Sequence, residues 1–295
     1  MEQKEIRDYI KAGEIAKQIT AYAKEIIKPE APLLEIAQKI HKKIEDLGAI
    51  PAFPVNLSVD DIAAHYHPTL NDETKASGLL KVDIGIQING FIADTAFSID
   101  LTPDNKYKEL IQASEKALEN ALKLLEKDPS LNEIGETIQK TIENKGFSPI
   151  INLSGHGLEK YEIHSNPTIP NYANGNENKL KEGAYAIEPF ATTGQGKIYE
   201  GSGSNIFALI NQKNTRNPAA RKILEYVVEK YKTLPFSLRE IQEKFGAMSR
   251  LAIKQMTQEG LLNEFPQLIE KSHSPVSQAE HTFIKEKNKI IVTTR

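Results

Sequence analysis

Apolar and polar residues alternate most regularly over residues 82–100, in the stretch VDIGIQINGFIADTAFSID. Alternation at every second position predicts β-strands, and Asn-Gly between two such runs is typical of a two-residue type I′ hairpin turn. The turn at Asn89 and Gly90 pairs Ile88 with Phe91. Because paired residue numbers then sum to 179, the register of the whole hairpin follows.

Two aspartates, Asp83 and Asp94, lie on one face of this predicted hairpin. Asp83 is opposite Ala96 and Asp94 is opposite Gly85, so the two acids are diagonal neighbours with Cα atoms roughly 7–8 Å apart. The apolar flanks indicate burial, where two like charges are unfavourable unless one takes a proton or a cation lies between them. The pair alone leaves three alternatives open, which are a metal site, an acid/base couple and an exposed acidic patch.

A helical pattern occurs twice, at an offset of 98 residues. Apolar residues recur at i, i+4 and i+8 within residues 33–51 and again within 130–149, which predicts two amphipathic helices. A glycine suited to the left-handed C-cap ends each of them, at Gly48 and Gly146. A longer predicted helix precedes each one, over residues 6–27 and 107–127.

The duplication extends to acidic residues. The segment Gly78–Asp83 corresponds to Gly183–Glu188, and Asp94-Thr-Ala-Phe corresponds to Glu280-His-Thr-Phe. If the two halves pack about a pseudo-twofold axis, four carboxylates converge, and such a buried cluster calls for two divalent cations. His156, in the sequence SGHGL, adds a nitrogen ligand that favours transition metals over magnesium or calcium.

The repeated pattern is interrupted in the second half, between the strands of its predicted hairpin. Residues 211–272 are expected to form a helical, winged-helix-like insertion, and residues 1–210 and 273–295 the body. Within the insertion, LLNEFPQLIE predicts a turn centred on Pro266. Arg216 to Lys271 contain ten basic and seven acidic residues, a surplus too small to predict nucleic-acid binding. Three short helices are predicted here, near 218–230, 237–245 and 249–259.

Composition narrows the classes of protein further. The 295-residue chain has a net charge of −3, which gives no global electrostatic case for binding nucleic acid or an anionic membrane. Cysteine is absent, which excludes disulfides and thiolate-bound zinc. The N-terminal segment predicts a charged amphipathic helix rather than a signal peptide, and no run is long enough to span a bilayer. A cytoplasmic location and no membrane partner are therefore expected.

Eight segments of the chain are PAFPVNLS (51–58), AAHY with His65, VDIG with Asp83, ADTA with Asp94, NLSGH with His156, IHS with His164, AIEPF with Glu188 and EHTF with Glu280. Together they resemble the type II methionine aminopeptidases of metallopeptidase family M24, in their short archaeal form. The resemblance covers nearly the whole chain, in the right order. It implies an α/β (α+β) pita-bread fold and two divalent metal ions per subunit, whether cobalt, manganese, iron(II), zinc or nickel. One departure is Ser165-Asn166, where the family more often has Ala-Gly.

The resemblance also implies a role for each matching residue. Asp94 and Glu280 would bridge both ions, Asp83 would bind one, and His156 with Glu188 the other. His65 and His164 correspond to two substrate-contacting histidines, and His164 would stabilise the charge on the carbonyl oxygen of the tetrahedral intermediate. Glu188 would also carry the proton from water to the leaving nitrogen. Because they neighbour these histidines in the sequence, Phe53 and Ile163 are candidates for the pocket that takes the methionine side chain.

The function implied is removal of the N-terminal methionine from nascent proteins and peptides, with a preference for a small second residue. The nucleophile would be a hydroxide held between the two ions. The expected partner is a chain that begins with methionine, the ribosome is a further candidate, and a monomer is expected.

Two other functions remain as alternatives. Prolidases and aminopeptidase P can share all five ligands, but they usually carry an additional N-terminal domain. A non-catalytic relative would instead bind RNA or ribosomes. The remaining histidines are expected to be surface or satisfied core residues, namely His41, His67, His273 and His281.

Overall fold

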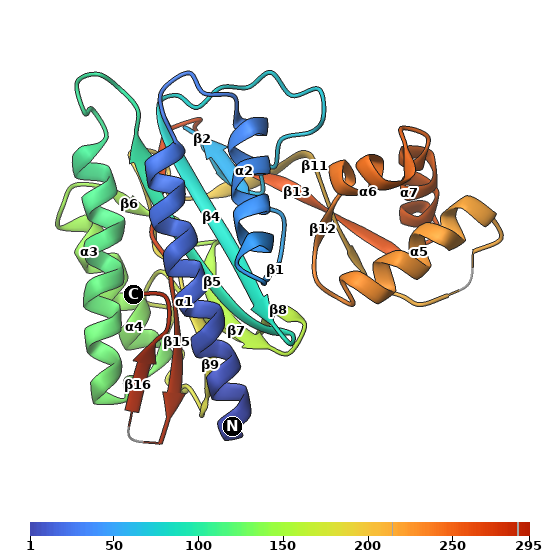
Figure 1. The fold of residues 1–295 in the computed structure, drawn as a ribbon. Coiled ribbons are helices and arrows are strands. Elements are labelled where there is room, and N and C mark those ends of the chain that lie inside the picture. The colour runs from blue at the N-terminus through green and yellow to red at the C-terminus, as the bar shows by residue number, and fades with distance from the viewer. Residues whose placement is uncertain (214, 288) are drawn as a thin grey trace.

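The computed structural model describes residues 1–213, 215–287 and 289–295, and its architecture is mixed α/β (Figure 1). Helices α1 to α4 cover one face of the strands, whereas α5, α6 and α7 lie apart from them at one side (Figure 1). The helices are α1 (Gln3–Ile26), α2 (Leu33–Asp46), α3 (Lys108–Leu124), α4 (Leu131–Glu143), α5 (Pro218–Lys230), α6 (Leu238–Phe245) and α7 (Ser249–Gln258).

Both predicted helix pairs form, and each packs on its own half of the strands. Ile19 of α1 and Ile40 of α2 share one buried cluster with Val82. In the second half, Leu118 and Ile138 share another cluster with Ile187. A short 3-10 turn, Leu125–Lys127, extends α3. Both predicted C-terminal glycines have positive φ, 73° at Gly48 and 82° at Gly146, as a left-handed cap requires.

The predicted hairpin has the predicted register. Strands β4 (Leu79–Ile88) and β5 (Phe91–Asp100) pair Ile88 with Phe91 and continue to Leu79 opposite Asp100. Asn89 and Gly90 have φ of 54° and 90°, the positive values that a type I′ turn needs. Strands β1 (Ile50–Pro51) and β2 (Asn56–Val59) pair with β4 to complete a four-stranded sheet.

The second half contains a much longer, interrupted hairpin. Strand β9 (Gly183–Ile187) pairs with β15 (His281–Glu286), β10 (Phe190–Thr192) with β14 (Val276–Gln278), and β11 (Ile198–Leu209) with β13 (Leu262–Glu270). The three helices α5 to α7 and strand β12 (Phe236–Ser237) lie between β11 and β13 in the chain. The remaining strands are β3 (Ile62–Ala64), β6 (Ser148–Pro149), β7 (Ser154–Glu159), β8 (Glu162–Pro170) and β16 (Lys289–Val292).

The predicted turn at Pro266 is wrong, because Pro266 lies inside strand β13. It pairs with Gly203 at a point where the register between β11 and β13 shifts. Proline lacks a backbone N–H, and an irregularity in the ladder is one of the places where a strand tolerates this. The three predicted helices of this region do form, with ends within a residue of the prediction. The division into a body and an insertion at residues 211–272 stays a prediction; strand β13 falls inside this range and pairs with β11, which lies outside it.

In the part of the chain that the structure describes, no helix combines the length and the apolar character needed to cross a bilayer.

Candidate functional site

The first hairpin places two carboxylates side by side on one face. Asp83 pairs with Ala96 and Asp94 pairs with Gly85, as the two-residue turn requires. Gly85 has a second role, since a Cβ atom at this position would lie 2.2 Å from the ring of Phe53. Because residue 85 is glycine, the Phe53 ring can lie against β4 at the residue that pairs with Asp94.

The second hairpin brings two more carboxylates to the same place. Glu188 follows β9 and Glu280 precedes β15, and their neighbours Ile187 and His281 are paired. The backbone N–H of Glu280 donates to the carbonyl oxygen of Ala96 at 2.9 Å, which joins the second hairpin to the first.

Two threonines strengthen this junction. The hydroxyl of Thr95 donates to the carbonyl oxygen of Glu280 at 3.0 Å. The hydroxyl of Thr282 donates to the carbonyl oxygen of Asp94 at 2.8 Å and accepts from the N–H of Asp94 at 2.7 Å. Each threonine thus ties one acidic residue to the opposite hairpin. The predicted convergence of the two halves is observed in this structure.

His156 enters the acidic cluster from β7, between two glycines. A Cβ atom at Gly155 would lie 2.3 Å from the carbonyl oxygen of Ala186, and one at Gly157 would lie 2.6 Å from that of Asn166. Glycine on both sides therefore allows β7 to fit between its neighbours.

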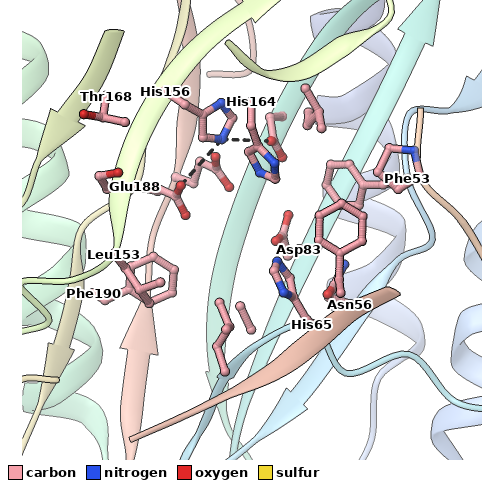
Figure 2. Close-up of a pocket in the computed structure, with 18 of the residues that line it drawn as sticks. Phe53, Asn56, His65, Asp83, Leu153, His156, His164, Thr168, Glu188 and Phe190 are labelled. Carbon is pink, nitrogen blue, oxygen red and sulfur yellow. Dashed lines mark ion pairs between the residues drawn. The ribbon is translucent and has the colours of Figure 1, made fainter. Parts of the chain in front are cut away.

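The ring of His156 is oriented by its own strand. Its Nδ1–H donates to the carbonyl oxygen of Gly157 at 3.2 Å, so Nε2 carries the lone pair. Nε2 lies 3.5 Å from Oε1 of Glu188 and 3.8 Å from Oδ2 of Asp94 (Figure 2). One ligand atom from each of Asp94, His156 and Glu280 lies within 4.8 Å of the others.

Burial controls the protonation of this cluster. It raises the pKa of Asp83 to about 7. Burial, and then the neighbouring carboxylates, raise the pKa of Asp94, Glu188 and Glu280 well above the ordinary value. Burial also lowers the pKa of His156 to about 4, so its imidazole is neutral at pH 7. The acids therefore keep protons unless cations compensate their charge.

The oxygen and nitrogen atoms present fit divalent cations. Among the described residues, Oδ1 of Asp83, Oδ1 of Asp94 and Oε1 of Glu280 are buried and have no hydrogen-bond partner. Buried polar atoms normally have one, and a bound cation would satisfy all three at once. Carboxylates together with a neutral imidazole are a donor set that transition metals accept.

A cavity of about 280 Å³ opens beside the acidic cluster, and all nine predicted site residues line it. In Figure 2, His65 and Phe53 lie on one side of the cavity, and Leu153 and Phe190 lie across from them. The nine residues are Phe53, His65, Asp83, Asp94, His156, Ile163, His164, Glu188 and Glu280.

His65 and His164 differ in how they are held. His65 has a φ of 65°, and its Nδ1–H donates to the carbonyl oxygen of Pro266 at 3.0 Å, so its Nε2 carries the lone pair. The ring of His164 stands edge-on to that of His156, with centroids 4.6 Å apart. Burial lowers the pKa of His65. His164 is exposed to the cavity, but surrounding protein atoms displace enough water to lower its pKa well below the ordinary value.

Sequence reasoning missed part of the cavity wall. Phe265 and Leu268 of β13 and Ile206 of β11 line the cavity, although they lie outside every segment to which the sequence assigned a site residue. The Phe265 ring lies 5.6 Å from that of His65 and 6.5 Å from that of His164. No local pattern could have assigned these apolar residues to the site, because their place depends on the pairing of β11 with β13.

Comparison with known proteins agrees with this geometry. Residues 7–215 match the metallopeptidase family M24. The methionine aminopeptidase of Pyrococcus abyssi is 42% identical over 290 residues, which cover 97% of this chain and 98% of that relative. The methionine aminopeptidase of Archaeoglobus fulgidus is 43% identical over 295 residues, which cover 99% of each.

A crystal structure of methionine aminopeptidase from Thermotoga maritima has the same fold. It superposes with a TM-score of 0.70 at 20% identity, over 100% of this chain and 98% of that one. The expected pita-bread α/β fold is therefore confirmed. The chain belongs to the metallopeptidase family M24, a family of hydrolases, and within it to the archaeal, type II methionine aminopeptidases.

Proposed function

We propose that this protein removes the N-terminal methionine from proteins and peptides. The observation that carries the proposal is the convergence of four carboxylates, two buried and two half-buried, and one neutral histidine beside a cavity with apolar walls. Relatives named methionine aminopeptidase, more than 40% identical over nearly their full length, support the same activity.

Five residues would hold the metal, as two divalent ions per chain. Asp94 and Glu280 are central to the cluster and are the candidates to contact both ions. When bound, the ions would supply a nucleophilic water of near-neutral pKa and polarise the scissile carbonyl. Cobalt, manganese, iron(II), zinc and nickel all suit this mixed donor set. The five ligands would be Asp83, Asp94, His156, Glu188 and Glu280.

The chain's own side chains would manage the protons and the substrate. Glu188 has a raised pKa, which suits a group that takes a proton and delivers it to the leaving nitrogen. His164 is held neutral and can still donate one N–H to the carbonyl oxygen as negative charge develops there. Nε2 of His65 carries a lone pair and can accept an N–H near the scissile amide. Phe53 and Ile163 would contact the methionine side chain.

The direct test is release of methionine from Met-Ala-Ser by metal-loaded protein, beside a panel of Xaa-Pro dipeptides. Methionine release without cleavage of the dipeptides supports the proposal. The reverse result would make the chain a prolidase-like enzyme. Replacing the proton carrier, in Glu188→Gln, should abolish turnover, whereas Glu182→Gln, at an exposed acid just before β9, should not alter it. Full activity of Glu188→Gln at saturating metal would exclude the proposed role of Glu188.

Four further features are also proposals, namely the second-residue preference, the monomeric state, the cytoplasmic location and the ribosome as a partner. A preference for a small second residue predicts faster release from Met-Ala-Ser than from Met-Leu-Ser. A monomeric state predicts a single species of about the chain mass of 32.9 kDa in analytical ultracentrifugation. Co-sedimentation of the protein with ribosomes would test the ribosome as a partner.

A further inference from the structure

Asn171 is fully buried, and its side-chain amide joins two residues of the cavity wall. It follows strand β8 directly and is 0% exposed. Its Nδ2 group donates to the carbonyl oxygen of Leu153 at 3.1 Å and to that of Glu188 at 3.1 Å. A carboxamide nitrogen has two protons, so both are used here. Leu153 and Glu188 themselves line the cavity.

The two carbonyl groups that accept these bonds belong to residues at strand ends. Glu188 lies in the two-residue gap between β9 and β10. Pro189 follows it and has no N–H with which to continue a ladder. Leu153 lies directly before β7. Because both carbonyl oxygens face a fully buried group, each needs a donor there, and Asn171 supplies it at positions outside the strand ladders.

The acceptors also explain why the residue is asparagine. A carbonyl oxygen can only accept, so the nitrogen of the carboxamide must face both of them. Oδ1 of Asn171 is buried and, in the described parts of the chain, has no hydrogen-bond partner. An unsatisfied buried oxygen is unfavourable, so core packing alone does not account for asparagine here. The two donated bonds are what this side chain contributes.

Helix α4 holds the segment that carries Asn171. A Cβ atom at Gly135, in α4, would lie 2.1 Å from the carbonyl oxygen of Tyr172, so glycine lets the segment touch the helix. The N–H of Ala173 donates to Oε1 of Gln139, also in α4, at 3.0 Å. The backbone on the C-terminal side of Asn171 is therefore packed on a helix, and its amide is presented from a fixed position.

The position of Glu188 matters because it is a proposed metal ligand and proton carrier. Its Oε1 lies 3.5 Å from Nε2 of His156. Glu188 and Leu153 lie on one side of the cavity, across from Phe53 (Figure 2). We propose that Asn171 is a positioning residue, which fixes Glu188 beside the acidic cluster and Leu153 in the cavity wall through their carbonyl groups. Its effect on turnover rests on the proposed function, whereas its effect on position does not.

Crystal structures of metal-free wild type and Asn171→Asp test the position directly. Aspartate has the same shape but donates at most one hydrogen bond, and only when protonated. We expect the Glu188 carboxylate to shift relative to Nε2 of His156 by more than about 0.5 Å, the tolerance of a preorganised site. Asn120→Asp is the matched control, because its amide joins α3 to Oγ1 of Thr141 in α4, at 3.1 Å, outside the cavity wall. An unmoved Glu188 in Asn171→Asp would overturn the proposal.

Titration with cobalt(II) measures the effect on the ligand set. Among the proposed ligands only Glu188 is displaced, so Asn171→Asp should weaken one of the two ions roughly 10- to 100-fold and leave the other near wild type. Asn120→Asp should bind cobalt as wild type does, even if its free energy of unfolding falls. Equal weakening of both ions, or weakening in the control, would indicate general disruption and reject a positioning role. If Asn171→Asp does not fold, Asn171→Ser, whose hydroxyl keeps one donor, gives the same comparison.

Kinetics separates the two sides of the cavity. At saturating cobalt, Asn171→Asp should lower kcat for Met-Ala-Ser at least about tenfold, because the proton carrier is displaced. KM should change by less than about twofold, since the proposed contacts of the methionine side chain are Phe53 and Ile163. A raised KM with unchanged kcat would contradict the positioning of Glu188. If wild-type protein releases no methionine, the proposed function fails, and the crystal structures still decide whether Asn171 positions Glu188.

Discussion

Replacing Asp83 by asparagine should stabilise the metal-free protein at neutral pH, and the structure gives the size of the effect. Burial raises the pKa of the Asp83 carboxyl from its ordinary value of 3.8 to about 7. Below about pH 4 the Asp83 carboxyl is protonated in both the folded and the unfolded chain, so it takes nothing from the free energy of unfolding there. As the pH rises to 7 the unfolded chain ionises first, and stability is lost. At about 1.4 kcal/mol per pKa unit, the loss approaches about 4 kcal/mol.

Urea unfolding with a chelator present measures this loss. Asp83→Asn should raise the free energy of unfolding by roughly 2–4 kcal/mol at pH 8 and by less than about 0.5 kcal/mol at pH 4. Asp104→Asn, at an exposed aspartate, is the control and should have no effect at either pH. With metal present the sign should reverse, because the variant loses a ligand. A variant that is equally or less stable than wild type at pH 8 in chelator would refute the argument that buried charge strains the empty cluster.

Further predictions concern the cavity wall, the helical region and the metal. Gly85→Ala should force the ring of Phe53 away from β4. It should lower the free energy of unfolding by about 1–3 kcal/mol and raise KM for Met-Ala-Ser, and unchanged values of both would show that the position of the ring does not depend on this glycine. Tyr231→Phe should cost about 1 kcal/mol in urea unfolding, since the hydroxyl donates to Glu240, and no loss would mean that water replaces it. Metal binding at pH 7 should release protons, because three of the acids have a pKa well above the ordinary value. Calorimetry in two buffers of different ionisation enthalpy measures the number of protons released, and a value of zero would contradict this prediction.

The parts of the fold that local chemistry decides were predictable from the sequence. Asn89-Gly90 fixes one turn type, and that turn alone sets the register that brings Asp83 and Asp94 to one face. The helices could be predicted for the same reason, since apolar spacing and the glycines at 48 and 146 act within a few residues. The internal duplication then located the second pair of acids without any knowledge of tertiary contacts.

The rest depends on contacts between distant segments. Pro266 predicted a turn because proline cannot donate to a ladder, yet the pairing of β13 with β11 accommodates it at a register shift. The same pairing brings Phe265 into the cavity wall. Such features follow from topology, which apolar periodicity does not encode.

The central claim is that the buried acids and His156 hold two divalent ions that the reaction requires. The most direct measurement is titration of chelator-treated, dialysed protein with cobalt(II), following bound metal and methionine release from Met-Ala-Ser in the same samples. Two ions per chain, with activity that appears only as they bind, is the predicted result. Protein that takes up no metal, or that releases methionine equally well without it, would contradict the claim.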